Sequence, residues 1–499
     1  MRSLTLALTL AAASAAPLLA QPVPAGPEVA VDSQPQDTHD TAVAAAADGG
    51  FLALWNDTGG PVRARAFGPG DVPRGSVSEL RPTAWQHAGE YSTDPLVERL
   101  SGGGYVAVWS NVLSTEIQGG LIELTATLAF RLLNADGQPA GPETVVADSV
   151  GLAAVAATLS GGFLLAWPDE PNGPLIVRRF DAQGAAVGGD VQVADRSWSA
   201  SMAALPEGGF VVAWSDGDPF LNPRLHYRIY AADGTPRTPD ISLQTGRLSG
   251  LGPWISADAA GRFVIAWIDQ TSTLMHRVRA HRFGAGGEPL GTEIAVTPEV
   301  PVEPMRSGDV AMRPDGSFLV VWNPYDANGI LARSYDADGT PQGAAFPVHT
   351  LPGAHYLPDA AATSRGWLVS WAQSHQGRLQ PYVRSFVAAD CGGADALCLN
   401  GNRFRATVAW QLPGTGPSFG TPIPLTGETG AFWFFTPANY ELAVKVLDGR
   451  GINGHFWVFY ASLTDVEFDL TVTDTITGEE RTYHNPAGTM ASRADTLAF

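Results

Sequence analysis

Lysine is almost absent from this chain. Lys445 is the only lysine among 30 basic residues, and 50 acidic residues bring the formal net charge to -20. Nucleic acids and anionic membranes are bound through clustered positive charge. The charge balance therefore predicts no nucleic-acid partner and no anionic lipid surface as a partner.

Long apolar runs are also missing, except near the N-terminus. The first 20 residues read MRSLTLALTLAAASAAPLLA, with Arg2 as a charged start, an apolar centre and small residues before Gln21. This pattern is typical of a secretory signal peptide, and its apolar centre is too short to span a membrane. We expect a signal peptide over residues 1–20, no membrane span, and a secreted protein that is extracellular or periplasmic.

Cysteine occurs only twice, as Cys391 and Cys398. Because an exported protein meets an oxidising environment, we expect these two cysteines to form a disulfide. Two cysteines without nearby histidines make a poor metal site. The sequence thus predicts no metal ligand set and no cofactor at this point of the chain.

Helical signals are scarce, whereas glycine and proline are frequent, with 56 and 38 residues, which favours short strands and turns. One strand recurs through the chain. It reads GGFVVAWSD at residues 208–216 and returns as GGFLALWND, GGYVAVWSN, GGFLLAWPD, GRFVIAWID, GSFLVVWNP and RGWLVSWAQ. The seven tryptophans of these copies are spaced about 50 residues apart: Trp55, Trp109, Trp167, Trp214, Trp267, Trp322 and Trp371.

A period near 50 in an all-strand sequence predicts a propeller, with one four-stranded sheet per repeat. An aromatic residue stands four positions before each tryptophan, and the residues between are mostly Leu, Val, Ile and Ala. Both faces of this strand are apolar, as expected for a strand packed between neighbouring sheets. We therefore predict an all-β, seven-bladed β-propeller over residues 21–390.

The last copy ends after its third strand, VRSF at residues 383–386, and lacks a fourth. The N-terminal segment AGPEVAVDS, residues 25–33, matches AGPETVVADS, which is the fourth strand of the second copy. We expect residues 25–33 to pair with the seventh copy and close the ring, which would remove exposed edge strands.

Turns of the type DAQG and DADG follow the third strands. They could be calcium loops, but a calcium loop needs several oxygen ligands at alternating positions, and the copies GPGD, AADG and GAGG lack them. Hairpin turns explain all the copies. Calcium stays open as an alternative, and we otherwise expect no cofactor.

The repeats resemble the GGFVVAW…RFDADGTPLG arrays of secreted bacterial repeat proteins, over roughly residues 25–390. From residue 391 the period stops, and alternating strands separated by Gly, Pro and Asn turns predict a β-sandwich over residues 391–499. This segment resembles an uncharacterised C-terminal module of secreted bacterial proteins through its CLNGNRF, FWFFTPANYELAVKVLDG and NGHFWVF strings. The resemblance implies an extracellular accessory domain and transfers no known chemistry.

Chemical motifs are few. Gly416–Gly420 matches the G-x-S-x-G pattern by letters only, because no strand and helix flank the serine. Binding residues usually lie on variable loops of a rigid scaffold, and here the long loops gather at one end of the ring. Carboxylates and rings at that end suit sugars or cationic peptides. The candidate ligand residues are Trp85, Tyr91, Trp198, Asp216, Asp218, Trp254, Asp269, Tyr325 and His355.

The sequence thus favours an extracellular binding or adhesion protein that is a monomer and holds a carbohydrate or protein ligand at the long-loop end. It contains no recognisable catalytic set. The alternative function is a secreted hydrolase or lyase acting on polysaccharide, with paired carboxylates such as Asp216 and Asp218 as its acid and base. Solvated strand ends and packing rings are the structural alternative for all these residues.

Overall fold

The computed structural model describes residues 22–32, 38–57, 60–81, 90–117, 121–148, 152–170, 172–216, 224–243, 247–248, 252–272, 275–298, 300–301, 307–324, 329–375, 377–388, 395–400, 403–426, 428–475 and 477–499. The signal segment and Cys391 lie outside these residues, so the signal peptide and the disulfide stay predictions. Cys398 lies in a described strand, and the described residues include no free cysteine. Within the described part of the chain, no helix has the length and apolarity needed to cross a membrane.

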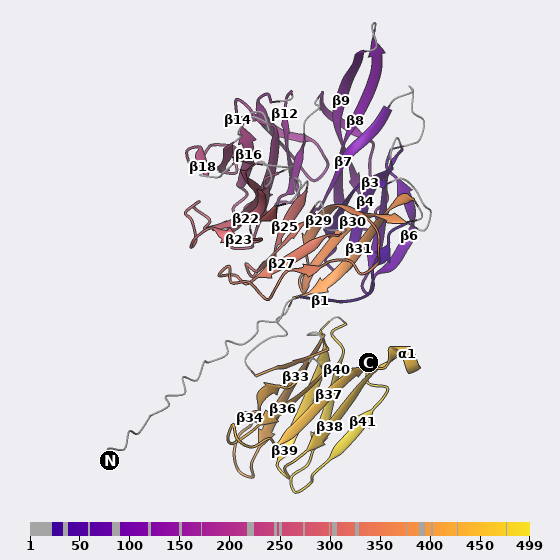
Figure 1. Cartoon of the computed structure of the whole chain (residues 1–499), viewed down its shortest axis with the longest axis vertical. Helices are drawn as coiled ribbons and strands as arrows, with labels where there is room; N and C mark the ends of the chain where they lie inside the picture. Colours follow the sequence, from indigo (N-terminus) through magenta and orange to yellow (C-terminus); the bar gives the residue numbers. More distant parts are fainter. Residues whose placement is uncertain are drawn as a thin grey trace, which may run out of the picture.

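The described residues up to 388 form seven antiparallel sheets, which we number 1 to 7 in chain order (Figure 1). Their strands are β3 (Thr38–Ala45), β4 (Phe51–Asp57), β5 (Val62–Gly68) and β6 (Val72–Glu79); β7 (Glu90–Arg99), β8 (Tyr105–Ile117), β9 (Leu121–Leu133) and β10 (Thr144–Asp148); β11 (Ala154–Ala157), β12 (Phe163–Pro168), β13 (Leu175–Phe180) and β14 (Ala186–Ala194); β15 (Ser199–Ala204), β16 (Phe210–Asp216), β17 (Arg224–Tyr230) and β18 (Ile241–Leu243); β19 (Arg247–Leu248), β20 (Trp254–Ala257), β21 (Phe263–Ser272), β22 (Met275–Phe283), β23 (Ile294–Ala295) and β24 (Val300–Pro301); β25 (Gly308–Met312), β26 (Phe318–Trp322), β27 (Leu331–Tyr335) and β28 (Phe346–Pro347); β29 (His355–Ala362), β30 (Gly366–His375) and β31 (Arg378–Val387).

The first long strand of each sheet contacts that of the next, and the series closes on itself. β3 contacts β7, β7 contacts β11, and the contacts continue through β15, β20, β25 and β29 back to β3. Sheets arranged radially around a central axis, each exposing little edge, are the arrangement of a β-propeller. The predicted all-β propeller fold is confirmed.

The last sheet takes its outer strand from the N-terminus. β1 (Val23–Pro24) and β2 (Val29–Ala30) both pair antiparallel with β31, with Val23 opposite Val387 and Val29 opposite Val383. Without these strands, β31 would be an unpaired edge. Residues at the two ends of the ring segment therefore share one sheet at the place where the sequence lacks a fourth strand.

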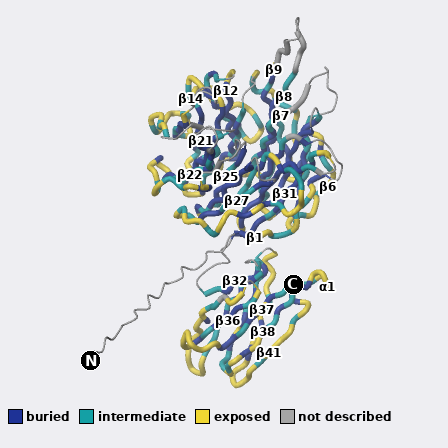
Figure 2. Tube along the Cα trace, viewed as in Figure 1, coloured by how far each residue is buried: buried dark blue, intermediate teal, exposed yellow. Residues whose placement is uncertain are grey.

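The repeated strand forms the middle of each sheet, and Figure 2 shows the buried residues concentrated there. Its seven tryptophans are at most 2% exposed. In sheets 1, 3, 4, 5 and 6 the aromatic residue four positions earlier stacks on an aromatic of the third strand, as Phe210 does on Tyr230 at a centroid distance of 4.9 Å. The preceding glycine pair fits a tight turn: Gly208 has φ +80°, and a Cβ on Gly209 would lie 2.4 Å from the Tyr230 carbonyl oxygen. The repeat is thus a packing and turn motif.

A repeated arginine ties neighbouring sheets together. It stands two positions before the last bulky residue of the third strand, which is aromatic except for Leu133 in sheet 2, and its guanidinium donates to a carbonyl in or directly after the outer strand of the preceding sheet. This inter-sheet bond occurs between Arg65 and Val31, Arg131 and Leu80, Arg178 and Val146, Arg333 and Val296, and Arg384 and Val348, with N···O distances of 2.5–3.1 Å.

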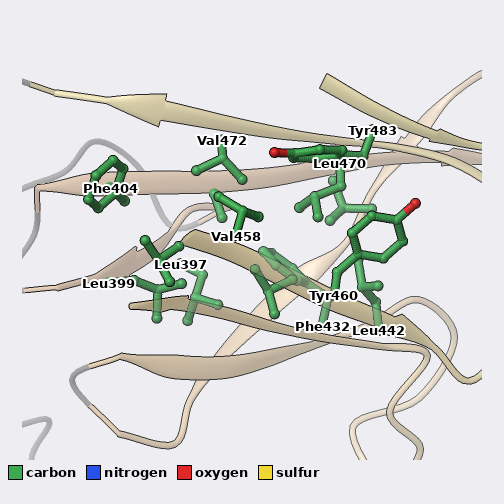
Figure 3. Close-up of a cluster of buried hydrophobic side chains, with 14 of the residues drawn as sticks. Leu397, Leu399, Phe404, Phe432, Leu442, Val458, Tyr460, Leu470, Val472 and Tyr483 are labelled. Atoms are coloured by element: carbon green, nitrogen blue, oxygen red, sulfur yellow. The ribbon is translucent and has the colours of Figure 1, made fainter. Parts of the chain in front are cut away.

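The C-terminal module consists of two five-stranded antiparallel sheets that share one core, which is the arrangement expected of a β-sandwich. Figure 3 shows side chains of both sheets pointing toward one another, with Phe404 and Leu470 from one and Phe432 and Val458 from the other. The elements are β32 (Leu397–Leu399), β33 (Phe404–Gln411), β34 (Ser418–Phe419), β39 (Glu467–Asp474) and β40 (Glu480–Asn485) in one sheet; β35 (Thr421–Pro424), β36 (Thr429–Trp433), β37 (Leu442–Asp448), β38 (Phe456–Ser462) and β41 (Ser492–Asp495) in the other; and α1 (Arg450–Asn453) between β37 and β38.

The aromatic runs of this module split between core and surface. Phe432 is fully buried and Phe434 is 6% exposed, whereas Phe435 is 47% exposed. Ser418, the serine of the G-x-S-x-G match, lies in the two-residue strand β34 and is exposed.

Candidate functional site

The central channel of the ring is a hollow that contains the candidate residue Trp254. It has a volume of about 570 Å³ and is lined by the first strands of the seven sheets. The channel can stay open because these strands carry mainly small residues, such as AVAA over residues 154–157 and SASMAA over 199–204. The first strands begin at the end of the ring where the long loops lie, and we call that opening the channel mouth.

The polar side chains of the channel are mostly acidic. Five carboxyl groups and one guanidinium occur among its described lining residues. They are Asp40, Asp94, Glu98, Asp309, Asp359 and Arg99.

Several of these side chains also connect neighbouring first strands. Asp309 Oδ2 accepts a hydrogen bond from the Ala360 amide at 2.9 Å, and Asp359 Oδ2 accepts one from the Val43 amide at 2.8 Å. The hydroxyl groups of Ser201 and Ser256 accept corresponding bonds from Ile255 and Met312 at 3.2 and 3.0 Å. A polar side chain therefore links each first strand from sheet 4 round to sheet 1.

Three of the channel carboxyl groups have raised pKa values. Burial raises the pKa of Glu98 to about 7, and the charge of Asp309 adds to this. Burial also raises the pKa of Asp309 to about 7 and raises that of Asp359, and the nearby charge of Asp309 raises the Asp359 pKa further. Carboxyl groups this close cannot both ionise easily, so the Asp309–Asp359 pair favours holding one proton near neutral pH.

β-Bulges distort the channel mouth in sheets 1, 2 and 7. The pairing register shifts between Thr38 and Thr41, between Thr93 and Leu96, and between Tyr356 and Asp359. Asp94 and Leu357 have φ +52° and +51°, a region that leucine rarely adopts. Bulges re-aim side chains and are frequent next to binding sites.

The second hollow lies between sheets 3 and 4 and has a volume of about 710 Å³. We call it the sheet 3–4 pocket; β14, β16 and β18 mark its region at the upper left of Figure 1. Its lining residues are Gln192, Val193, Ala194, Asp195, Arg196, Trp214, Asp216, Arg224, His226, Arg228 and Asp240.

Asp216 is held in this pocket by its neighbours. Its Oδ1 accepts the Arg224 amide hydrogen at 2.8 Å, and its Oδ2 accepts a hydrogen from the Arg224 guanidinium at 2.9 Å. Burial alone would raise the Asp216 pKa, but these bonds and the nearby His226 ring more than offset it, so the pKa is lowered. Asp216 is therefore an ionised acceptor at neutral pH, as a ligand-binding carboxylate requires.

Among the other candidate ligand residues, three are placed near the long-loop end. Trp254 begins β20 and lines the channel, with its ring against Gly252 and Gly308. Trp198 directly precedes β15 and is 36% exposed. Tyr91 lies in β7 opposite Val112. Trp85, Asp218 and Tyr325 lie outside the described residues.

Two candidate residues, Asp269 and His355, are buried in the structure. Asp269 is 1% exposed, and its Oδ2 lies 2.8 Å from Arg277 and 3.0 Å from Arg279. His355 is 2% exposed, and its ring stacks on His349 at 3.5 Å. Both side chains are used within the fold, because neighbouring strands supply arginines or a ring that cover them.

The turns considered as calcium loops use their acids for the backbone. Asp336 Oδ1 accepts the amide hydrogens of Asp338 and Thr340 at 2.9 and 2.8 Å, and Asp181 does the same for Gln183 and Ala185. These are turn-stabilising bonds. In the part of the chain that the structure describes, no group of three or more His, Cys, Asp or Glu side chains is arranged to hold a metal ion.

The channel carboxyl groups and His226 are not among the residues that the sequence pattern marked as ligand candidates. The sequence did contain a signal for the carboxyl groups. Glu98, Asp309 and Asp359 stand in the first strands PLVER, GDVAM and PDAAA, at positions where most other copies have a small or apolar residue. Aligning the seven copies strand by strand would have marked Glu98, Asp309 and Asp359 as departures from the repeat.

Comparison with known proteins finds similarity of shape alone. Neither a protein-family model nor a curated protein sequence matches this chain. A protein of unknown function from Dyadobacter fermentans shares 13% identity with a TM-score of 0.46, covering 74% of this chain and 99% of its own. The polysaccharide lyase Uly1 shares 8% identity with a TM-score of 0.44, covering 70% and 90%.

A third similar structure is the GH93 α-L-arabinofuranosidase of Fusarium graminearum, solved with arabinobiose. It shares 10% identity with a TM-score of 0.42 and covers 74% of this chain and 97% of its own. At this level of similarity these structures carry no argument about the activity of this chain. Its function has to be argued from its own residues.

Proposed function

We propose that this chain is a secreted, monomeric seven-bladed β-propeller protein with a C-terminal β-sandwich, and that it binds an extracellular carbohydrate or protein ligand at the channel mouth. The observation that carries the proposal is the composition of that mouth. The channel, with a volume of about 570 Å³, contains five carboxyl groups, of which Asp40 and Asp94 lie with the Trp254 ring near the beginnings of the first strands. Binding pockets of this size typically pair an apolar wall with a few polar groups that fix orientation.

The chemistry of the channel mouth selects the ligand class. Carboxylates accept hydrogen bonds from sugar hydroxyl groups, and they attract cationic side chains of a peptide. An anionic ligand would be repelled, because Arg99 is the one guanidinium among the described lining residues. The ligand is accordingly a neutral or cationic sugar, or a cationic peptide segment.

The test is a glycan and peptide binding array, repeated with Trp254→Phe and Asp40→Asn. We expect Asp40→Asn to weaken binding of the best array ligand at least fivefold without changing the melting temperature. Asp233→Asn is the matched control, because Asp233 is an exposed turn acid that bonds Thr235. Equal binding by the wild-type protein and Asp40→Asn would contradict the proposal, as would an array without any ligand.

A second candidate function is favoured by the Asp309–Asp359 pair. Burial raises the pKa of both carboxyl groups, and paired carboxyl groups, one of them with a raised pKa, are the usual acid and base of sugar-cleaving enzymes. A secreted polysaccharide hydrolase or lyase would then use these two residues. A polysaccharide-degradation screen of the wild-type protein and Asp309→Asn separates the functions: turnover lost in the variant supports the enzyme, and binding without turnover supports the first proposal.

A further inference from the structure

The sheet 3–4 pocket lies where the repeat departs from its own rule. In five other sheets the repeated arginine reaches a carbonyl of the preceding sheet. The equivalent residue of sheet 4 is Arg228, whose Nε donates to the Thr238 carbonyl of its own sheet at 3.0 Å. Among the described residues Arg228 makes no hydrogen bond to sheet 3. The pocket opens at this interface, with Val193 and Arg228 both on its wall.

The residue opposite the repeated tryptophan, which varies from sheet to sheet, also shapes this pocket. In sheets 1 and 5, the residue opposite the repeated tryptophan is an arginine, Arg63 or Arg279, which lies between an acid of the second strand and an acid at the fourth. In sheet 4 that residue is His226, opposite Trp214. Because histidine is shorter than arginine, His226 fills less of the space beside the tryptophan than Arg63 and Arg279 do in sheets 1 and 5.

His226 is fixed and almost fully buried. It is 7% exposed, its ring stacks on Trp214 at 5.4 Å, and its Nδ1 donates to Asp240 Oδ1 at 2.7 Å. Its Nε2 lies 3.3 Å from Asp216 Oδ2 without hydrogen-bond geometry. A buried ring nitrogen without a hydrogen bond is costly unless something else satisfies it, and this one lines an open pocket.

The pocket also offers a cation without a partner. Arg196 follows β14, is exposed, and makes no hydrogen bond or ion pair within the described part of the chain. Arg228 lines the same wall, whereas Arg224 is already paired with Asp216. The guanidinium groups of Arg196 and Arg228 can therefore donate hydrogen bonds to a carboxylate, each through its planar set of N–H groups.

The acceptors of the pocket determine the rest of the ligand. The carboxylates of Asp195 and Asp240 and the amide of Gln192 line the same pocket as the arginines. They accept hydrogen bonds from hydroxyl groups, but they would repel a run of acidic side chains. A ligand with one carboxylate and several hydroxyl groups matches both sets.

We propose that the sheet 3–4 pocket is a second ligand site that binds an acidic sugar unit, a hydroxyl-rich ring bearing one carboxylate. The site is separate from the channel mouth and does not depend on the ligand proposed there. Arg196 and Arg228 bind the carboxylate, and Asp195, Asp240 and Gln192 bind the hydroxyl groups.

The experiment is a titration of the full chain with a glucuronic-acid-terminated oligosaccharide, its glucose-terminated counterpart and an acidic peptide. We expect the uronate oligosaccharide to bind at least tenfold more tightly than the other two. Arg196→Ala should weaken this binding at least tenfold at an unchanged melting temperature. Arg237→Ala is the matched control, because Arg237 is an exposed sheet 4 arginine paired with Glu207.

The variant His226→Arg restores the residue type of sheets 1 and 5 and fills the pocket. We expect it to keep or raise the melting temperature while abolishing uronate binding. Trp254→Phe, at the channel mouth, should leave this binding unchanged. Equal binding of the glucose-terminated oligosaccharide, tighter binding of the acidic peptide, or undiminished binding by Arg196→Ala would each overturn the proposal.

Discussion

Asp309 and Asp359 show how single residues in the channel combine two tasks, and Glu98 shares one of these tasks with them. Asp309 and Asp359 hold neighbouring first strands through backbone amides, so they contribute to the ring as acceptors. All three are also ionisable groups whose burial opposes their charge. An ionised channel attracts a cationic or hydroxyl-rich ligand, but ionisation costs stability.

This cost predicts a pH dependence. Because the folded pKa of Glu98 is raised to about 7, its contribution to stability is fully present below the unfolded pKa of about 4.3 and is lost as the pH rises through about 7. Glu98→Gln cannot ionise, so it should unfold with a free energy about 1–3 kcal/mol higher than the wild-type protein at pH 8. At pH 4 the two should be equal. Urea unfolding at both pH values measures the difference, and Glu207→Gln at an exposed turn is the control; a difference that is the same at both pH values would contradict the account.

Replacing Trp214 and replacing Trp198 should change the free energy of unfolding by different amounts. Trp214 is 2% exposed and belongs to the packed repeat, whereas Trp198 is 36% exposed at the long-loop end. Trp214→Ala should lower the free energy of unfolding by about 3–5 kcal/mol, and Trp198→Ala by less than about 1. Chemical denaturation of both variants measures this. If Trp198→Ala costs as much as Trp214→Ala, then Trp198 is a packing residue and not a ligand contact.

The sequence predicted where the repeated residues lie in the strands, but it did not predict which of the polar residues after the tryptophan is buried by neighbouring side chains. Asp216 and Asp269 follow the repeated tryptophan at the same offset, so the pattern treats them alike. In the structure Asp269 is buried beside Arg277 and Arg279, whereas Asp216 lines a pocket. The difference depends on which side chains of the neighbouring strand contact the carboxylate. Strand periodicity gives the face on which a side chain lies, but not these contacts.

At the level of the strand, the short N-terminal segment supplies the outer strand of sheet 7. β1 and β2 contain only four residues in regular pairing, yet they cover the outer edge of β31. Glu28, between them, accepts a hydrogen bond from the Thr350 hydroxyl at 2.7 Å and lies 3.8 Å from Arg384. The match between residues 25–33 and an internal fourth strand made this pairing predictable from the sequence, because outer strands repeat as the others do.

Deleting residues 21–33 should expose β31 and destabilise the ring. We expect a loss of several kcal/mol, against a total of about 5–15 kcal/mol for a folded domain, together with aggregation at the exposed edge. The melting temperature of the truncated protein measures the loss. A synthetic peptide of residues 21–33 should restore part of the melting temperature, and a scrambled peptide should not; an unchanged melting temperature after the deletion would refute the closure.

Considered as a whole molecule, the chain joins a rigid ring to a two-sheet module with its own core. The ring places its short turns at one end and its channel mouth at the other. The mouth residues come from strands that are far apart in the sequence, such as Asp40 and Asp359. Ring closure brings these residues together. The repeat therefore predicted the scaffold, whereas the set of residues at the channel mouth became known only from the structure.

Hydrogen exchange of the full chain with and without its best array ligand tests the central claim most directly. The account predicts slower exchange in the strand beginnings at the channel mouth, within residues 38–45, 90–99, 252–257, 307–312 and 355–362. Exchange in the short turns at the opposite end and in the C-terminal module should stay unchanged. Protection confined to those turns or to residues 395–499, with none at the channel mouth, would contradict the account.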